Sequence, residues 1–388
     1  MISVAAAKKI IAENKLRLPT ALLPLKDSLQ RMLAEDIHSP VDVPAYPQSS
    51  MDGYAFAYTD WQPKKRLTIN GEMQAGTRSP FSIGPGQAAR IFTGAPLPTG
   101  ADTVIMQEKV TIQNNELIID EENLLPGNSV RAKGGAIKAG ETALYKNSLL
   151  TPGAIGFLAG MGITHVPVFA RPKISIIVTG NELQQPGIAL GYGEVYESNS
   201  FALTAALQQL QITGVQVYSA TDELETVQQV LSTALAGSDL VLLTGGVSVG
   251  DYDFVVQAAA TCGVTQLFHR IKQRPGKPLY FGKKGNQLVV GLPGNPSSVL
   301  TCFYEYVLPA LQVALPILRV PLTAGYQKPA GLTHFLKGFY NGNTVKPLDA
   351  QESYRMSSFA VANCLIQLEE ETTICREGEM AEIHLLSF

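Results

Sequence analysis

Residues 239–253 read DLVLLTGGVSVGDYD, which joins a short apolar run to a glycine turn and two carboxylates. The first five residues have the length and composition of a strand buried on both faces. Gly245 and Gly246 can adopt backbone angles that other residues avoid, so their N–H groups can approach an anion. Asp251 and Asp253 lie one residue apart, close enough to share a cation. The stretch predicts a phosphate and metal seat, with a tight turn and a solvated aspartate cap as the alternative.

The same succession of strand and helix extends over residues 171–314. Strands are predicted at 173–178, 215–220, 239–243 and 287–292, and helices at 198–211, 223–236, 254–261 and 297–311. Strands and helices that alternate in this way specify a doubly wound α/β domain, with a parallel sheet covered on both faces. Ligands of such sheets bind at the carboxyl ends of the strands.

The rest of the chain predicts further domains, so that the whole is a multidomain protein of the α/β plus β class. Helical spacing marks residues 3–15, with Ser3 as N-cap, and residues 25–33, while a helix begins at Pro152. Short apolar runs divided by Gly, Pro and Asn predict a β-rich insert. The expected domains are a discontinuous helical domain (1–38 and 126–170), the β-rich insert (39–125), the α/β domain (171–314) and a C-terminal β domain (315–388).

Composition excludes several classes of protein. The chain has 388 residues, 45% hydrophobic and 16% charged, with a net charge of −3, so it predicts a folded protein without a basic field for nucleic acid. Four cysteines without a CxxC pair favour reduced thiols and a cytoplasmic location. The N-terminus is unlike a signal peptide, and no stretch is long and apolar enough to predict a membrane span.

Polar residues gather where the predicted strands end. The acids are Glu182, Asp222, Asp251 and Asp253; the bases are Arg270, Lys272, Arg274 and Lys277; the turn residues are Gly180, Gly245, Gly246, Ser248, Pro293, Gly294, Asn295 and Pro296. Carboxylates repel phosphate unless a divalent cation lies between them, whereas arginine and lysine bind it directly. The cluster predicts a ligand that carries several phosphate or oxyanion charges together with a divalent metal such as Mg²⁺. Helix caps and a solvated basic face are the bland alternatives.

The β-rich insert has two further polar turns. SSMDGYA contains Asp52, and FTGAPLPTGAD contains Thr93. A hairpin turn explains the first of these turns as well as a binding role does.

The order of these motifs resembles that of a known family. SSMDGYA, ARIFTGAPLPTGAD, VTGNEL, TGGVSVGDYD, RPGKP, GLPGNP and RMSSFAVAN are similar to the motifs of the molybdopterin molybdenumtransferases and of the C-terminal part of gephyrin, over nearly the whole chain. The resemblance implies a helical domain, a β insert, a central molybdopterin-binding α/β domain and a small C-terminal β-barrel, in a homodimer. It also implies a Mg²⁺-dependent reaction in which adenylylated molybdopterin loses AMP as molybdate is inserted.

The resemblance assigns roles to residues of this chain. Glu182, Asp222 and Asp253 would handle metal and pyrophosphate, and Asp251 is a weaker ligand candidate. Molybdate or phosphate would be bound by Arg270, Arg274 and Lys277, with Pro293, Pro296 and Ser357 or Ser358 shaping the oxyanion pocket. Asp52 and Thr93 would reach the site from the partner subunit. The molybdopterin adenylyltransferase and cofactor-accepting apoenzymes are the implied protein partners; nucleic acid and membrane are not expected.

Two departures from the family pattern leave alternatives open. Arg274 stands before PGKP at a position where the family often has lysine, a change that keeps the charge but alters its geometry. Gly135 and Ala136 stand where the family has two acids, so activity is reduced, metal coordination is altered, or Glu141 supplies the missing carboxylate. A carrier or scaffold that binds molybdopterin but inserts metal poorly is therefore one alternative function. An adenylyltransferase is another, disfavoured because that enzyme resembles only the central domain.

Overall fold

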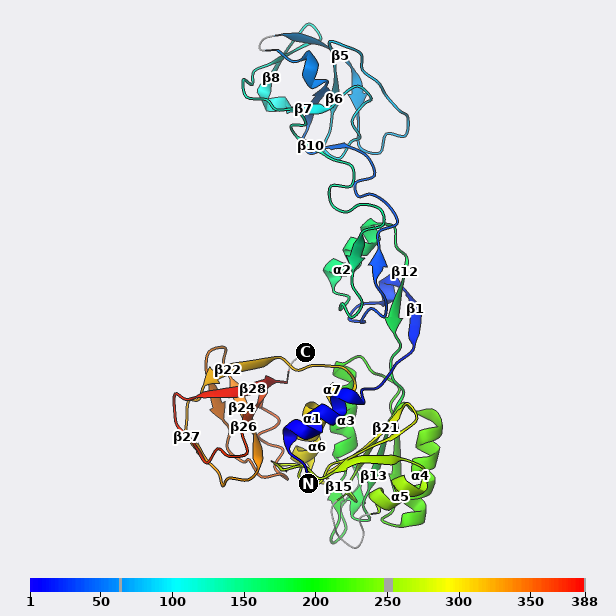
Figure 1. Cartoon of the computed structure of the whole chain (residues 1–388), viewed down its shortest axis with the longest axis vertical. Helices are drawn as coiled ribbons and strands as arrows, with labels where there is room; N and C mark the ends of the chain where they lie inside the picture. The colour runs from blue at the N-terminus through cyan, green and yellow to red at the C-terminus, as the bar shows by residue number, and fades with distance from the viewer. Residues whose placement is uncertain (63–64, 248–253, 387–388) are drawn as a thin grey trace. The chain divides into compact units, whose positions relative to one another are not determined.

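The computed structural model describes residues 1–62, 65–247 and 254–386, in two compact units (Figure 1). Unit 1 comprises Met1–Leu18 and Arg171–Phe388, and unit 2 comprises Pro19–Ala170. The chain thus leaves unit 1 after its first helix and returns to it about 150 residues later. The expected helical domain ran over residues 1–38 and 126–170, whereas the structure places residues 1–18 with the α/β domain.

A six-stranded sheet forms the centre of unit 1. Its strands, in spatial order, are β16 (Gln216–Ala220), β13 (Ile174–Thr179), β17 (Leu240–Thr244), β21 (Gln287–Leu292), β20 (Tyr280–Lys284) and β18 (Thr265–His269). The first four strands are parallel, as expected from the alternation of strands and helices. β20 is antiparallel to both of its neighbours, so the sheet is mixed, and the wholly parallel sheet expected from the sequence is wrong in this part.

Helices cover both faces of this sheet because alternate residues of each strand point to opposite sides. Leu240 and Leu242 of β17 lie in one apolar cluster, and Val241 and Leu243 lie in another. The first cluster includes α1 (Val4–Glu13), α3 (Asn199–Gln209) and α6 (Pro296–Cys302), and the second includes α4 (Leu224–Gly237) and α5 (Val255–Thr261). Figure 1 shows α4 and α5 on the side of the sheet opposite α3. The inner strands β13, β17 and β21 are buried from both sides, as their composition predicts, whereas the edge strands β16 and β18 are partly exposed.

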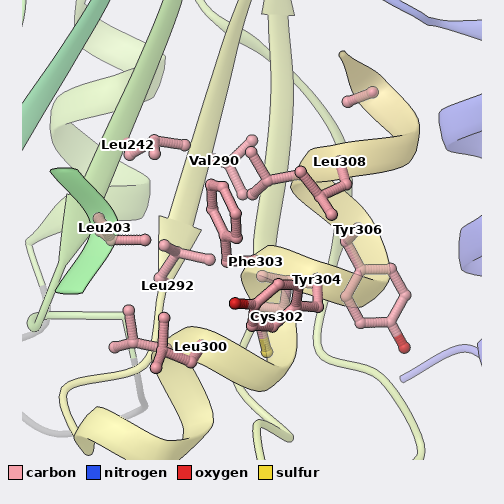
Figure 2. Packing of buried hydrophobic residues seen from close by; sticks show 14 of the residues in the cluster. Leu203, Leu242, Val290, Leu292, Leu300, Cys302, Phe303, Tyr304, Tyr306 and Leu308 are labelled. Atoms are coloured by element: carbon pink, nitrogen blue, oxygen red, sulfur yellow. The ribbon is translucent and has the colours of Figure 1, made fainter. Parts of the chain in front are cut away.

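The last helical segment of the α/β domain packs against this sheet. After α6 the chain continues as a π-helical turn, η4 (Phe303–Val307), and α7 (Leu308–Ala310), where one helix over 297–311 was expected. Figure 2 shows Phe303 beside the sheet residues Val290 and Leu292. These residues belong to one continuous core that also contains Phe335 and Leu365 of the C-terminal region.

The N-terminal helix α1 belongs to this core as well. The Ser3 hydroxyl accepts a hydrogen bond from the Ala6 N–H (3.2 Å), which confirms the predicted N-cap. Lys8 Nζ lies 2.7 Å from Glu305 Oε2, and His384 Nδ1 lies 2.6 Å from Glu305 Oε1. Burial works to raise the pKa of Glu305, but the hydrogen bond from His384 and the charge of Lys8 outweigh it and leave this pKa lowered. The carboxylate therefore joins α1, the π-helical turn and the last strand.

The C-terminal part of unit 1 is a second mixed sheet. Its strand order is β19 (Gln273–Arg274), β24 (Thr333–Tyr340), β26 (Cys364–Leu368), β28 (Met380–Leu385) and β22 (Ile317–Pro321), with β25 (Val345–Pro347) also paired to β24. An isolated bridge between Leu322, which follows β22, and Val345 joins the β22 end of this path to β25. Small pairs complete the unit: β14 (Leu183–Gln184) with β15 (Val195–Tyr196), and β23 (Tyr326–Gln327) with β27 (Ile374–Cys375). Through β19, residues of the α/β domain enter this sheet.

Unit 2 contains the predicted β-rich region. Six strands pair in the order β7 (Thr103–Met106), β4 (Gly53–Phe56), β6 (Gln87–Ile91), β5 (Arg66–Met73), β9 (Glu116–Ile119) and β8 (Val110–Gln113). Short 3₁₀ turns are η2 (Tyr58–Asp60) and η3 (Gln107–Lys109). A Cβ at Gly53 would lie 1.9 Å from the Ile105 carbonyl oxygen, so only glycine allows β4 and β7 to pair here.

The remainder of unit 2 packs around α2 (Pro152–Gly160), which begins at the predicted proline. The strand pairs β1 (Thr20–Pro24) with β12 (His165–Phe169) and β2 (Ile37–His38) with β11 (Thr142–Leu144) share one apolar cluster with α2. A third pair, β3 (Gln48–Ser49) with β10 (Val130–Arg131), lies at the β-rich region, where Val130 packs against the core of the six-stranded sheet. The helix expected over 25–33 is wrong: only the 3₁₀ turn η1 (Leu25–Asp27) forms. Gln30 has a φ of +58°, which no α-helix accepts.

Two global features bear on the sequence-based expectations. All four cysteines are free thiols, without a disulfide. Within the described ranges, no helix has the length and apolar character needed to cross a membrane.

Candidate functional site

A cavity of about 920 Å³ lies in unit 1 beyond the carboxyl ends of β13, β17 and β21, between the α/β domain and the C-terminal β domain. Eleven of the predicted site residues line it: Gly180, Glu182, Asp222, Gly245, Gly246, Arg274, Lys277, Pro293, Gly294, Asn295 and Pro296. Segments that are far apart in the sequence thus meet at the edge of the sheet where ligands of α/β folds bind.

Glycines bring two of the strand ends close together. Gly245 and Gly246 follow β17 with φ angles of +88° and +59°, a region that glycine occupies without strain. A Cβ at Gly245 would lie 2.5 Å from the carbonyl oxygen of Thr179 at the end of β13. Gly294, after β21, is also close: a Cβ added to it would lie 3.8 Å from Gly245 Cα. A side chain at position 245 would push the loops apart, so the glycine turn is required by the site's shape.

Two acids face the cavity from neighbouring strands. Glu182 follows β13, and Asp222 follows β16. Asn181 connects them, because its N–H donates to Asp222 Oδ2 (3.4 Å) and its side-chain Oδ1 accepts from the Asp222 N–H (3.1 Å). This reciprocal pair fixes the turn that carries Asp222 beside the turn that carries Glu182.

A buried glutamine shapes the basic loop QRPGKP. Gln273 is 1% exposed, and its Nε2 donates to the carbonyl oxygens of Pro275 (2.9 Å) and Gly276 (3.1 Å). Its Oε1 accepts a hydrogen bond from the Tyr306 hydroxyl. The glutamine thus fixes the loop backbone against the core. The side chains of Arg274 and Lys277, on the same loop, are exposed and line the cavity.

The turn at the start of α6 is held from two sides. Asn295 Nδ2 donates to Ser353 Oγ (2.9 Å), and the Ser297 N–H donates to the Ser353 carbonyl oxygen (3.1 Å). From the other side, Asn199 Nδ2 donates to the carbonyl oxygen of Gly294 (2.9 Å). The start of α6 is therefore fixed by α3 and by a loop of the C-terminal domain.

The structure adds lining residues that sequence reasoning missed. Gln351, Glu352, Ser353 and Tyr354 reach the cavity from the C-terminal β domain, and Glu197 and Asn199 reach it from the start of α3. For the first group the available signal was the polar run QESY near the quoted RMSSFAVAN motif. For the second it was the polar ESNS run that opens a predicted helix.

Other predicted residues lie elsewhere. Arg270, Ser357 and Ser358 are described but do not line the cavity. Ser358 is buried, and its hydroxyl donates to the Ala350 carbonyl oxygen (2.8 Å), so it supports the loop from behind. Ser353 is the serine of this region that lines the cavity. Ser248, Asp251 and Asp253 lie outside the described residues.

A second cavity of about 530 Å³ shares four lining residues with the first: Arg274, Pro275, Gln351 and Glu352. His334, which is 3% exposed, also lines it. Burial, together with the positive charges of Lys328 and Arg274, lowers the pKa of His334 to about 4. The imidazole is therefore neutral at physiological pH.

The predicted residues of the β-rich insert form their own cluster in unit 2. Asp52 Oδ1 accepts hydrogen bonds from the Thr93 N–H (2.7 Å) and from the Thr93 hydroxyl (2.7 Å). These bonds lower the pKa of Asp52, and Arg90 contributes through its charge. The structure thus brings together the two insert residues that the sequence singled out, as an exposed and ionised carboxylate.

Glu141 already has a role in its own turn, close in sequence to Gly135 and Ala136. Its carboxylate accepts a hydrogen bond from the Lys138 N–H (3.0 Å). Asp42, on an adjacent segment, accepts from the Ala139 N–H (2.9 Å) and lies 3.3 Å from Lys133 Nζ. Both carboxylates are thus held in the turns beside Gly135 and Ala136 by these bonds.

The donor set of the cavity suits a magnesium ion that substrate helps to hold. Within residues 1–62, 65–247 and 254–386, no three His, Cys, Asp or Glu side chains form a group able to hold a metal ion by themselves. Mg²⁺ usually takes only one or two protein carboxylates and completes its shell with phosphate and water. Glu182 and Asp222, which line one cavity, meet that requirement.

Comparisons with known proteins agree over the length of the chain. Three family models match in succession: the MoeA N-terminal region (domain I and II) over residues 2–162, a probable molybdopterin binding domain over 175–313, and the MoeA C-terminal region (domain IV) over 319–386. A molybdopterin molybdenumtransferase of Haemophilus influenzae is 33% identical over 98% of both chains. One from Nostoc sp. is 38% identical over 73% of this chain and 66% of its own length.

A solved structure gives the same result. The molybdopterin biosynthesis MoeA protein of Pyrococcus horikosii superposes with a TM-score of 0.86 at 30% identity, over 100% of both chains. The match includes the central domain that carries the cavity and the C-terminal region that closes it. The chain therefore belongs to the molybdopterin molybdenumtransferase (MoeA) family of molybdenum cofactor biosynthesis.

Proposed function

We propose that this chain inserts molybdate into adenylylated molybdopterin with release of AMP. The observation that carries the proposal is the single cavity in which two acids, two bases and a glycine turn meet at the strand ends. A pyrophosphate-linked pterin has charges for the glycine N–H groups and the bases. Molybdate is a tetrahedral dianion, which arginine and lysine also bind. The volume of about 920 Å³ falls within the range of cavities that hold cofactor-sized ligands.

The lining residues divide into groups with different tasks. The N–H groups of Gly245 and Gly246 would donate hydrogen bonds to phosphate oxygens, while Arg274 and Lys277 would bind molybdate or phosphate. Glu182 and Asp222 would hold Mg²⁺, with Asp253 and Asp251 as further candidates from the sequence. The ion would neutralise the pyrophosphate and so favour departure of AMP. Pro293 and Pro296 keep the last turn rigid beside these groups.

Asp52 and Thr93 would act together in the same reaction. Their exposed, hydrogen-bonded pair is a fixed negative charge that a ligand or cation from solution can reach. We propose that the protein is a homodimer in which this pair completes the partner's site. Its other partners would be the adenylyltransferase that makes its substrate and the apoenzymes that take its product, in the cytoplasm.

Release of AMP tests the proposal directly. Purified protein is mixed with adenylylated molybdopterin, molybdate and Mg²⁺, and AMP is measured by chromatography. We expect AMP and molybdenum-loaded cofactor in equal amounts, and no AMP without Mg²⁺. Net consumption of ATP from a mixture of ATP and molybdopterin would instead identify an adenylyltransferase and contradict the proposal.

A carrier function is the second candidate, because Gly135 and Ala136 replace two acids and Glu141 is bound to its own turn. A carrier would bind the adenylylated pterin tightly without releasing AMP. Ala136→Asp distinguishes the two cases. For a carrier, the new carboxylate starts AMP release, whereas in an active enzyme it changes the existing rate only modestly.

A further inference from the structure

A lysine buried inside the C-terminal domain supports one wall of the cavity. Lys337 lies in β24 and is 2% exposed. Its Nζ donates to the carbonyl oxygens of Ala350 (2.7 Å), Arg355 (3.0 Å) and Glu352 (3.4 Å). A buried ammonium is stable only when its donors are satisfied, and here all three acceptors belong to the loop of residues 350–355.

A second set of bonds joins the same strand residue to the same loop. The Lys337 N–H donates to Gln351 Oε1 (2.9 Å), and Gln351 Nε2 donates back to the Lys337 carbonyl oxygen (2.9 Å). Gln351 Nε2 also donates to the Leu348 carbonyl oxygen (2.7 Å). The strand and the loop are therefore connected by both the main chain and the side chain of one lysine.

The front of this loop is part of the binding cavity. Residues 351–354 line it, and Ser353 bonds to Asn295 and to the Ser297 N–H at the start of α6. The loop is thus fixed behind by Lys337 and in front by the turn that shapes the proposed oxyanion pocket. A change at Lys337 would reach the cavity through the loop, although the lysine itself does not line it.

We propose that Lys337 is a positioning residue that sets the place of the 350–355 loop and hence the affinity of the cavity for its anionic substrate. The part that concerns substrate rests on the proposed function. The lysine Nζ donates hydrogen bonds to three carbonyl groups at once, whereas methionine, of similar length, has no donor. Without it the loop loses its rear support, and Ser353 loses its fixed position beside Asn295.

The chain offers a matched control in Lys328, which is 4% exposed. Its Nζ also donates to three carbonyl oxygens: Leu332 (2.8 Å), Glu370 (3.2 Å) and Pro329 (3.5 Å). None of these belongs to the 350–355 loop. Lys328→Met therefore removes a buried ammonium of the same kind from the same unit, and serves as the control for stability and for local motion.

Amide hydrogen exchange of the protein without substrate is the first measurement. The amides that report on this loop are those of Arg355, which donates to the Glu352 carbonyl oxygen (3.1 Å), and of Ser297, which donates to the Ser353 carbonyl oxygen (3.1 Å). In Lys337→Met we expect exchange of these two amides to accelerate at least ten-fold, with wild-type exchange there in Lys328→Met. Lys337→Arg, which can still donate to several carbonyls, should restore much of the protection. If Lys337→Met does not fold, Gln351→Leu, which removes the reciprocal amide bonds, should accelerate the same amides. Unchanged exchange in this loop in the folded variants would overturn the proposal.

AMP release provides the second measurement. Lys337→Met should raise KM for adenylylated molybdopterin at least ten-fold with a smaller change in kcat, and Lys337→Arg should recover most of the loss. Equal effects on KM in Lys337→Met and Lys337→Arg, with normal loop exchange in both, would contradict positioning through the loop. If the wild-type protein releases no AMP, the proposed function fails while the exchange result still decides the role of Lys337.

Discussion

Gly276 in the QRPGKP loop provides the sharpest test of how the cavity is built. It has a φ of +84°, and an added Cβ would lie 2.4 Å from Cys302 Sγ and 2.9 Å from Gln273 Nε2. Alanine in this backbone region costs about 1 kcal/mol. An extra methyl group in a packed site costs a further 1–3 kcal/mol or so. We therefore expect Gly276→Ala to lower the free energy of unfolding by about 3 kcal/mol.

Gly285→Ala is the matched control. Gly285 lies in the same unit with a φ of +59°, but no atom lies within 4 Å of its added Cβ. It should therefore show the backbone cost alone, about 1 kcal/mol. Both variants are unfolded in urea and followed by far-ultraviolet circular dichroism, which reports the helices. The wild-type protein sets the reference for each.

Cys302 identifies the atom responsible for the difference. It is completely buried, and burial raises the pKa of its thiol, so it is an uncharged packing group. In a Cys302→Ala background the sulfur is gone, and the cost of Gly276→Ala should fall toward that of the control. Equal destabilisation by Gly276→Ala and Gly285→Ala, or the same cost with and without Cys302, would refute this account of the loop.

Three further outcomes follow from the site and its surroundings. Asp253→Asn should abolish AMP release while the unfolding midpoint in urea stays unchanged; wild-type turnover would contradict its assigned role. Glu182→Gln should raise the Mg²⁺ concentration needed for half-maximal AMP release at least several-fold, and an unaltered Mg²⁺ titration would count against it as a ligand. His334 has a folded pKa of about 4, below the ordinary 6.5, so the unfolded chain takes up its proton first as the pH falls. Stability should therefore drop between pH 6.5 and 4, by at most about 2 kcal/mol at pH 5. His334→Gln should flatten this part of the urea-midpoint profile, and an unchanged slope would show that other groups cause the drop.

The sequence predicted the four parallel strands of the central sheet because they are short, mostly apolar and separated by helices. It did not predict β18 and β20, since no helix lies between them and their residues are partly polar. The helix expected over 25–33 failed for a local reason. Leu25 and Leu33 are both buried, but the Ser28 hydroxyl bonds to the Leu25 carbonyl oxygen (2.7 Å) and Gln30 turns the chain away.

The strand-end part of the site was predictable because topology alone brings the ends of parallel strands together. The same rule gives no information about a loop from another domain, so residues 351–354 were missed. Ser357 and Ser358 were chosen from the right segment, but the direction of each side chain depends on the turns around Ala350. Lys337 carried no signal, since its role depends on three carbonyl groups that only the fold brings to it.

The bond between Lys8 and Glu305 also affects how the chain is made. The two residues are 297 positions apart, so α1 leaves the ribosome long before its partner exists. Unit 2 is one continuous segment and can fold during this interval, because domains generally fold as units during synthesis. His384 arrives last. A chain released early, without β28, would bury the Glu305 carboxylate with one partner missing, and such a charge is strongly destabilising. Incomplete copies should therefore be unstable enough for proteases to remove them before they compete for the pterin.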